Sequence, residues 1–80
     1  MNSKTFEQLQ IKLAKDIKAA RRAAGMSQEA LALQAEVDRT YVSQLERGIA
    51  NPSLLVLYRL ASVLGCDLNV TLGKSETKDA

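Results

Sequence analysis

The fold of this chain is decided by residues 27–48, which read SQEALALQAEVDRTYVSQLERG. Ser27 and Asp38 are residue types that favour the N-cap of a helix, so the stretch predicts two short helices, at about 28–35 and 38–47. The connection between them is too short for anything but a sharp corner. The second helix has one apolar face and one polar face, so we expect it to pack on one side and present the other.

A long helix is predicted before this stretch, because apolar residues recur there three or four positions apart. They are Phe6, Leu9, Leu13, Ile17, Ala20 and Ala24. The helix is expected to run from about Thr5 to Ala24, and Gly25 follows as a residue that can end it. The apolar positions expected to face inward from the two short helices are Leu31, Ala32, Ala35, Val37, Val42, Leu45 and Ile49, with Gly48 ending the second helix.

A fourth helix is expected after Asn51-Pro52-Ser53, with Pro52 at or near its first position. It should end at about Leu64, before Gly65. Its apolar residues cover more than one stripe; they are Leu54, Leu55, Val56, Leu57, Leu60, Ala61, Val63 and Leu64. A surface helix of a monomer needs only one apolar face. The surplus therefore predicts a second buried surface, most simply a contact between subunits.

The end of the chain has a different period. Residues 67–72 alternate polar and apolar, which predicts a strand with Leu68, Val70 and Leu72 on one face. A lone strand leaves its backbone groups unpaired, so we expect it to pair with the same strand of a second copy in a homodimer. A short fifth helix over the same residues is the alternative. Residues 73–80 are expected to form a flexible tail, which leaves residues 1–72 as the single domain.

Composition excludes several classes of protein. Eighty residues form one small domain. No disulfide can form within the chain, because Cys66 is the only cysteine. The absence of histidine removes the usual metal ligand and general base, so we expect no enzyme, no catalytic residue, no metal and no cofactor. The net charge of +2 does not by itself indicate a partner. No apolar run approaches the ~20 residues that span a bilayer, and residues 1–10 are polar, so a cytoplasmic protein without a membrane partner is expected.

With these elements in place, the chain resembles the Cro/C1-type (XRE) helix-turn-helix domain of lambdoid phage repressors. The matching elements are Arg21, Gly25, Ser27-Gln28, Leu31-Ala32, Val37, Val42-Ser43, Leu45-Glu46, Gly48, Asn51-Pro52-Ser53 and Leu60-Ala61 with Leu64. The resemblance covers more than half of the chain. It implies an all-α fold, a lambda-repressor-like bundle of four to five helices with the helix-turn-helix at 28–47. The final LGCDLNVTL is similar to the antitoxin HipB, whose chain ends in a dimer-forming strand.

One position departs from the family pattern. The turn residue that this motif often fills with glycine is Glu36 here. If Glu36 adopts a positive φ, the cost is on the order of 1 kcal/mol. The alternative is a corner of slightly different geometry, which would change the aim of the second helix.

The resemblance also implies roles for individual side chains. Base contacts fall on Arg39, Thr40 and Gln44, with Ser43 beside them, in the first exposed turns of the helix at 38–47. Phosphate contacts are expected from Ser27, Gln28, Tyr41, Arg47 and Asn51. Arg21 and Glu46 are implied to form a partly buried ion pair that holds the reading helix in place and does not itself read DNA.

The implied function is sequence-specific DNA binding by a transcriptional regulator, most simply a repressor, which reads a palindromic operator as a homodimer. It would be bacterial or phage-encoded and associated with the nucleoid when bound. The alternative is a HipB-like antitoxin that binds a toxin protein and regulates its own operon. A purely architectural helical module, without sequence preference, is a third option.

Overall fold

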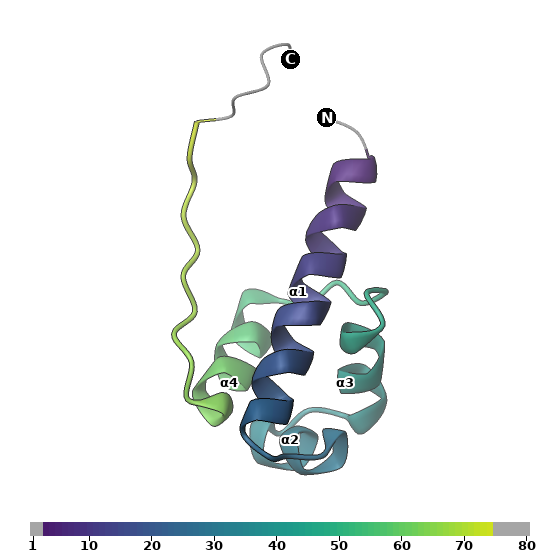
Figure 1. The fold of residues 1–80 in the computed structure, drawn as a ribbon, viewed down its shortest axis with the longest axis vertical. Coiled ribbons are helices and arrows are strands. Elements are labelled where there is room, and N and C mark those ends of the chain that lie inside the picture. Colours follow the sequence, from purple (N-terminus) through teal and green to yellow (C-terminus); the bar gives the residue numbers. More distant parts are fainter. Residues whose placement is uncertain (1–2, 75–80) are drawn as a thin grey trace.

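The structure is a computed structural model and describes residues 3–74. These residues form four helices: α1 (Ser3–Ala23), α2 (Gln28–Ala35), α3 (Arg39–Glu46) and α4 (Leu54–Leu64) (Figure 1). α2 packs against both α3 and α4, and α1 lies across α3. The all-helical bundle with a helix-turn-helix is therefore confirmed. Within the described range, no helix combines the length and the apolar character needed to cross a membrane.

α2 and α3 begin at the residues that the sequence predicted as caps. The Ser27 Oγ accepts a hydrogen bond from the Ala30 N–H at 3.0 Å, and Asp38 Oδ1 accepts one from the Thr40 N–H at 2.9 Å. α4 begins later than expected, because Ser53 is its N-cap and Pro52 precedes the cap. The hydroxyl of Ser53 accepts from the N–H of Val56, a bond that a proline side chain cannot supply.

All four helices described here end in the same way, with a residue of left-handed backbone and two reversed hydrogen bonds. At the end of α3, Gly48 has a φ of +76°, its N–H bonds to the Leu45 carbonyl, and the Ile49 N–H bonds to the Gln44 carbonyl. The left-handed residue is Gly25, Gly48 or Gly65 after three of the helices and Glu36 after α2. The glycine stops are therefore confirmed, and Glu36 does adopt a positive φ.

The core lies where α2, α3 and α4 meet. Its fully buried side chains are Leu31, Val42, Leu45 and Leu60, and the small Ala32 and Ala35 allow α3 to cross α2 closely. The prediction that Ile49 faces inward is wrong: it is 58% exposed, and Ala50 is buried in its place. The reason is that Gly48 redirects the chain, so the helical period does not extend to residue 49.

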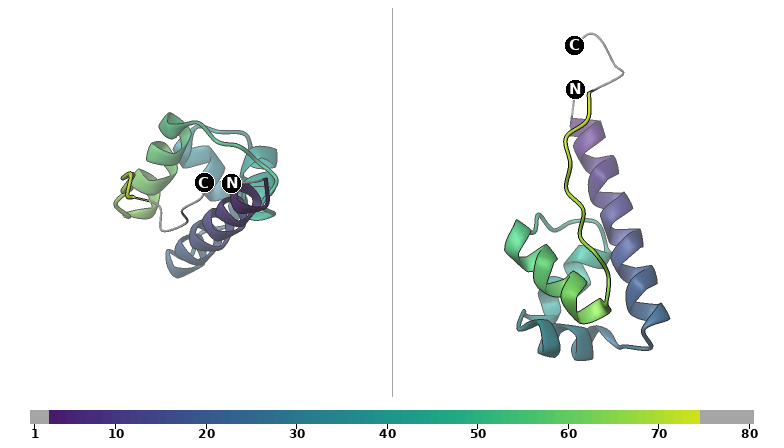
Figure 2. Two further views of the ribbon diagram at one scale, coloured as in Figure 1. Left: turned by 90° about the horizontal axis from the view of Figure 1, so that it is seen from above. Right: turned by 90° about the vertical axis from the view of Figure 1, so that its left-hand side faces the viewer.

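Two parts of the chain extend beyond the bundle in the same direction (Figures 1 and 2). One is the first half of α1, where Phe6 and Leu9 are exposed. The other is the extended segment after Gly65, which forms neither the fifth helix nor, within one chain, a paired strand. The fifth-helix alternative is wrong, and the strand at 67–72 stays a prediction. Of the expected flexible tail, residues 75–80 lie outside the described residues.

Candidate nucleic-acid interface

α3 presents a polar face on the side opposite to its buried residues. Val42 and Leu45 fix the helix to the core. At about 100° of rotation per residue, the four predicted base-contacting residues span an arc of about 140° on the other side. They are Arg39, Thr40, Ser43 and Gln44; three are exposed and Ser43 is half-buried. The structure therefore brings all four predicted side chains together on one accessible face.

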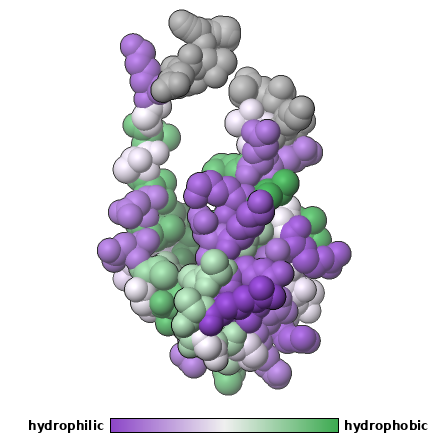
Figure 3. Space-filling model, in the orientation of Figure 1, coloured by the Kyte–Doolittle hydropathy of each residue, from purple (hydrophilic) through white to green (hydrophobic). Residues whose placement is uncertain are grey.

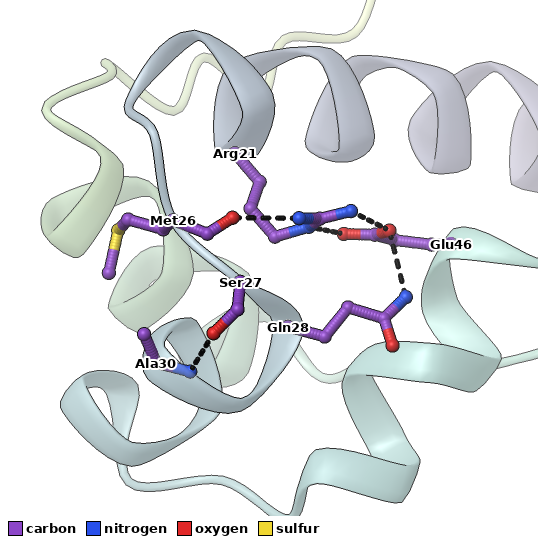
Figure 4. A network of polar contacts seen from close by, with 6 residues as sticks. All are labelled: Arg21, Met26, Ser27, Gln28, Ala30 and Glu46. Carbon is purple, nitrogen blue, oxygen red and sulfur yellow. Dashed lines mark hydrogen bonds and ion pairs between the residues drawn. The ribbon is translucent and has the colours of Figure 1, made fainter.

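A partly buried polar network fixes α3 to the rest of the bundle (Figure 4). The Arg21 guanidinium, from α1, makes two hydrogen bonds to the Glu46 carboxylate of α3: Nε donates to Oε2 at 2.7 Å and Nη2 to Oε1 at 3.0 Å. Its Nη1 donates to the Met26 carbonyl in the α1–α2 loop at 2.7 Å. The side chains of Arg21 and Glu46 are only 11% and 2% exposed. The Arg21 guanidinium therefore joins α1, the loop between α1 and α2, and α3 at one point.

The charges in this network favour their ionised forms. The hydrogen bond to Glu46 raises the pKa of Arg21, against the opposing effect of burial, and the charge of Glu46 adds to the rise. Burial by itself would raise the pKa of Glu46. Hydrogen bonds from Arg21 and Gln28, together with the charges of Arg21 and Lys18, outweigh that effect and hold the pKa of Glu46 below its ordinary value. Glu46 is therefore an ionised, fully partnered buried carboxylate.

The start of α2 holds Ser27 and Gln28, two of the residues expected at a phosphate, and that expectation stays a prediction. The Gln28 side-chain amide donates to Glu46 Oε1 at 3.0 Å, so in the unbound chain one of its two N–H groups serves the network. Ser27 is exposed, and its hydroxyl caps the helix through the N–H of Ala30. Among the described residues, the backbone N–H groups of Gln28 and Glu29 have no hydrogen-bond partner. These two N–H groups, at the positive end of the helix dipole, are the free donors at this point.

The other three expected phosphate contacts lie at the edges of α3. Arg47 is its C-cap and Asn51 lies in the loop that follows, and both are exposed. Tyr41 is half-buried and packs against the core. Arg47 and Asn51 therefore have freer side chains than Tyr41.

Sequence reasoning missed two members of the network. The Met26 carbonyl accepts from Arg21, but a backbone group carries no residue-type signal. The contact of Gln28 with Glu46 was also missed, because the family assigns that glutamine to a phosphate. No signal in the sequence points to this contact, because it depends on where α1 and α3 bring Arg21 and Glu46.

Comparison with known proteins places this geometry in context. The family model HTH_3, described as helix-turn-helix, matches residues 17–70. The chain is 42% identical over 45 residues to an uncharacterised HTH-type transcriptional regulator, y4dJ, of Sinorhizobium fredii, covering 56% of this chain and 58% of that one. It is 38% identical over 58 residues to the control protein C.BamHI of Bacillus amyloliquefaciens, covering 66% and 72%. The chain thus spans less than two thirds of the length of the first of these relatives.

A solved structure has the same arrangement of helices. It is the restriction-modification controller protein C.AhdI from Aeromonas hydrophila, with a TM-score of 0.71 and 38% sequence identity. The match covers 72% of this chain and 88% of that chain. The likeness therefore takes in nearly the whole of the controller protein and the bundle described above.

Proposed function

Because the chain belongs to the HTH_3 helix-turn-helix family, we propose that it is a transcriptional regulator that binds double-stranded DNA through α3. The observation that carries the proposal is the polar face of α3, which is exposed while its opposite face is pinned to the core. A helix of this width fits the major groove, where each base pair presents a distinct pattern of donors and acceptors.

Each side chain on this face suits a particular contact. Arg39, at the first position of α3, can donate two of its guanidinium N–H groups to the O6 and N7 atoms of a guanine. Gln44 can pair in the same bidentate way with the N6 and N7 atoms of an adenine. Thr40 and the half-buried Ser43 offer shorter contacts to a base edge or to the methyl group of a thymine.

Phosphate contacts would set the register of α3 in the groove. The free N–H groups of Gln28 and Glu29 are suited to one phosphate at the start of α2. Arg47 and Asn51 are suited to a second phosphate after α3, and Tyr41 and Ser27 can add contacts at the edges. The role of Gln28 itself is then to orient Glu46 and, through it, α3.

A second copy is part of this proposal. α3 has eight residues and offers four side chains to the bases, so one copy can read only a short half-site. Two copies related by a two-fold axis would read a palindrome whose half-sites lie about 34 Å apart. A bound homodimer would block access to a promoter that overlaps the operator, which makes repression the simplest outcome.

Selection of bound sequences from a random DNA pool tests the proposal. We expect one enriched palindrome whose half-site centres lie about one helical turn, or a small multiple of it, apart. The control is Arg59→Ala, which removes an exposed arginine from α4 and should leave the enriched sequence unchanged. If the chain enriches no sequence, or binds random DNA as tightly as the selected site, sequence-specific regulation is ruled out.

A narrower role is favoured by two of the relatives. C.BamHI is named a control protein and C.AhdI a restriction-modification controller protein, and the likeness to C.AhdI spans 88% of that chain. The regulated genes would then be those of a restriction-modification system. Mapping bound fragments of the native genome tests this role, because sites away from such genes would remove it and leave the general function intact. None of the relatives described above is named an antitoxin.

A further inference from the structure

The segment after α4 has an unpaired backbone and a symmetric pattern of side chains. Residues 68–72 read Leu-Asn-Val-Thr-Leu, which is apolar, polar, apolar, polar, apolar in both directions from Val70. The segment is extended, and within the described chain the backbone N–H and C=O groups of residues 67–74 form no hydrogen bond to other backbone groups. Val70 and Leu72 are exposed, Leu72 completely. An extended edge of this kind is a template for pairing with another strand.

α4 presents an apolar face to this segment. Leu54, Leu55 and Tyr58 are exposed large side chains, and they line one open groove together with Leu68 and Val70. The space-filling view shows hydrophobic side chains recurring down the C-terminal segment toward the bundle (Figure 3). This face is the surplus apolar surface that the sequence of α4 predicted. The apolar side of the segment and the apolar side of α4 therefore share one groove that the single chain leaves open.

We propose that residues 68–72 pair antiparallel with the same residues of a second copy, with the two-fold axis at Val70. Val70 then lies opposite the partner's Val70, and Leu68 lies opposite the partner's Leu72, all on one side of the ribbon. That side packs on the Leu54, Leu55 and Tyr58 face of both copies. A two-stranded ribbon is marginal alone, and the helical face supplies the packing that it needs. The inference rests on the homodimer of the proposed function.

The side-chain pattern fits a second copy of the same strand and fixes the register. The segment is complementary to itself, because pairing about a two-fold axis at Val70 sets apolar side chains against apolar ones and polar against polar. An axis at Thr71 would place Leu68 opposite the charged Lys74, and an axis at Asn69 would place Leu72 opposite Cys66. Only the axis at Val70 matches the three large apolar residues with one another. The ribbon would also set the distance between the two copies of α3, and so the half-site spacing.

Disulfide trapping tests the register directly. Cys66 is exposed and is first replaced by serine. In that background V70C should form a disulfide-linked dimer under mild oxidation, because directly opposed residues lie within disulfide range. L68C mixed with L72C should give the mixed disulfide in excess over either homodimer. N69C is the matched control, since its own copy lies diagonally at about 7–8 Å. Trapping of N69C as fast as V70C, or no trapping at any position, overturns the register.

Oligomeric state tests the ribbon itself. V70K should weaken dimerisation at least tenfold in sedimentation, while T71K, on the other side of the strand, should sediment like the parent. The segment lies outside the core, so the helical circular dichroism of both variants should match the parent. If V70K dimerises like the parent, the ribbon is wrong. DNA selection with the full chain then decides the proposed function separately, because a dimer formed by another surface could still read a palindrome.

Discussion

The α2–α3 pair and the segment after Gly65 complete their hydrogen bonding in different ways. In the α2–α3 pair, caps, reversed terminal bonds and the Arg21–Glu46 network are all supplied by one chain. In residues 67–74 no backbone hydrogen bond is formed within the described chain, and the apolar side chains are mostly exposed. The first region therefore completes its hydrogen bonding within one chain, whereas the second leaves its backbone groups open, as the proposed pairing with a second copy requires.

Removal of the Glu46 carboxylate should have the largest effect on the first region. Glu46→Ala leaves the Arg21 guanidinium buried without its partner, and we expect a loss of about 3–5 kcal/mol in the free energy of unfolding. Denaturant titration at fixed protein concentration measures it. Glu29→Ala, which removes an exposed carboxylate from α2, should change stability by less than about 0.5 kcal/mol. A similar small loss for both variants would mean that the network contributes nothing to the fold.

The two leucines of α2 test how much burial contributes to stability, because one is buried and the other is exposed on the same helix. Leu31 is fully buried and Leu33 is 79% exposed. Leu31→Ala should cost about 2–5 kcal/mol, since it removes a large side chain from a closed core. Leu33→Ala should be nearly neutral or slightly stabilising, because alanine has the higher helix propensity. If Leu33→Ala costs as much as Leu31→Ala, then the exposed face of α2 is also covered in the assembled protein.

A substitution on the reading face should leave stability unchanged and alter recognition. Arg39→Ala should weaken binding to the selected operator by about 1–3 kcal/mol and relax the preference at one base pair in each half-site. The repeated selection with the variant measures both effects. A uniform loss over all sequences, with the preference unchanged, would make Arg39 a phosphate contact.

Protonation of Glu46 at low pH should reduce stability less than the Glu46→Ala substitution, because the protonated side chain stays in place. The pKa of Glu46 is lowered in the folded chain, so its contribution is fully present above the unfolded value of about 4.3. The contribution is lost as the pH falls below that value and through the folded pKa. The stability difference between the parent and Glu46→Gln should therefore shrink as the pH is lowered from about 4.3. A difference that stays constant down to pH 2 contradicts the lowered pKa.

Local signals account for most of what the sequence predicted. Ser27 and Asp38 set the starts of α2 and α3 through their own side chains, so residue type was sufficient. Ile49 was misplaced because helical periodicity was extended beyond the glycine that ends it. The orientation of the Gln28 amide toward Glu46 was not predictable, since it depends on where α1 and α3 bring Arg21 and Glu46. The residues at 67–72 carry a clear period, but the strand it predicts forms no pairing within the described chain, so its partner stays part of the proposal.

Substitution of Glu36 should have the smallest effect on stability, and it tests whether the left-handed backbone at this position favours glycine. Glu36 ends α2 with the same two bonds as the glycine-ended helices: its N–H bonds to Leu33 O at 3.3 Å and the Val37 N–H to Ala32 O at 2.9 Å. Its φ of +60° costs a residue that has a Cβ about 1–2 kcal/mol, and glycine avoids this cost. Glycine also loses more conformational entropy on folding, which offsets about 0.5–1 kcal/mol of the gain. Glu36→Gly should therefore stabilise the chain by up to about 1 kcal/mol without changing the selected operator.

Glu36→Ala is the matched control, because alanine keeps the Cβ that makes a positive φ costly. It should give no stabilisation in the same denaturant titration. Equal gains from alanine and glycine would assign the effect to the loss of the carboxylate. A changed operator in Glu36→Gly alone would mean that the residue at this corner also sets the aim of α3 into the groove.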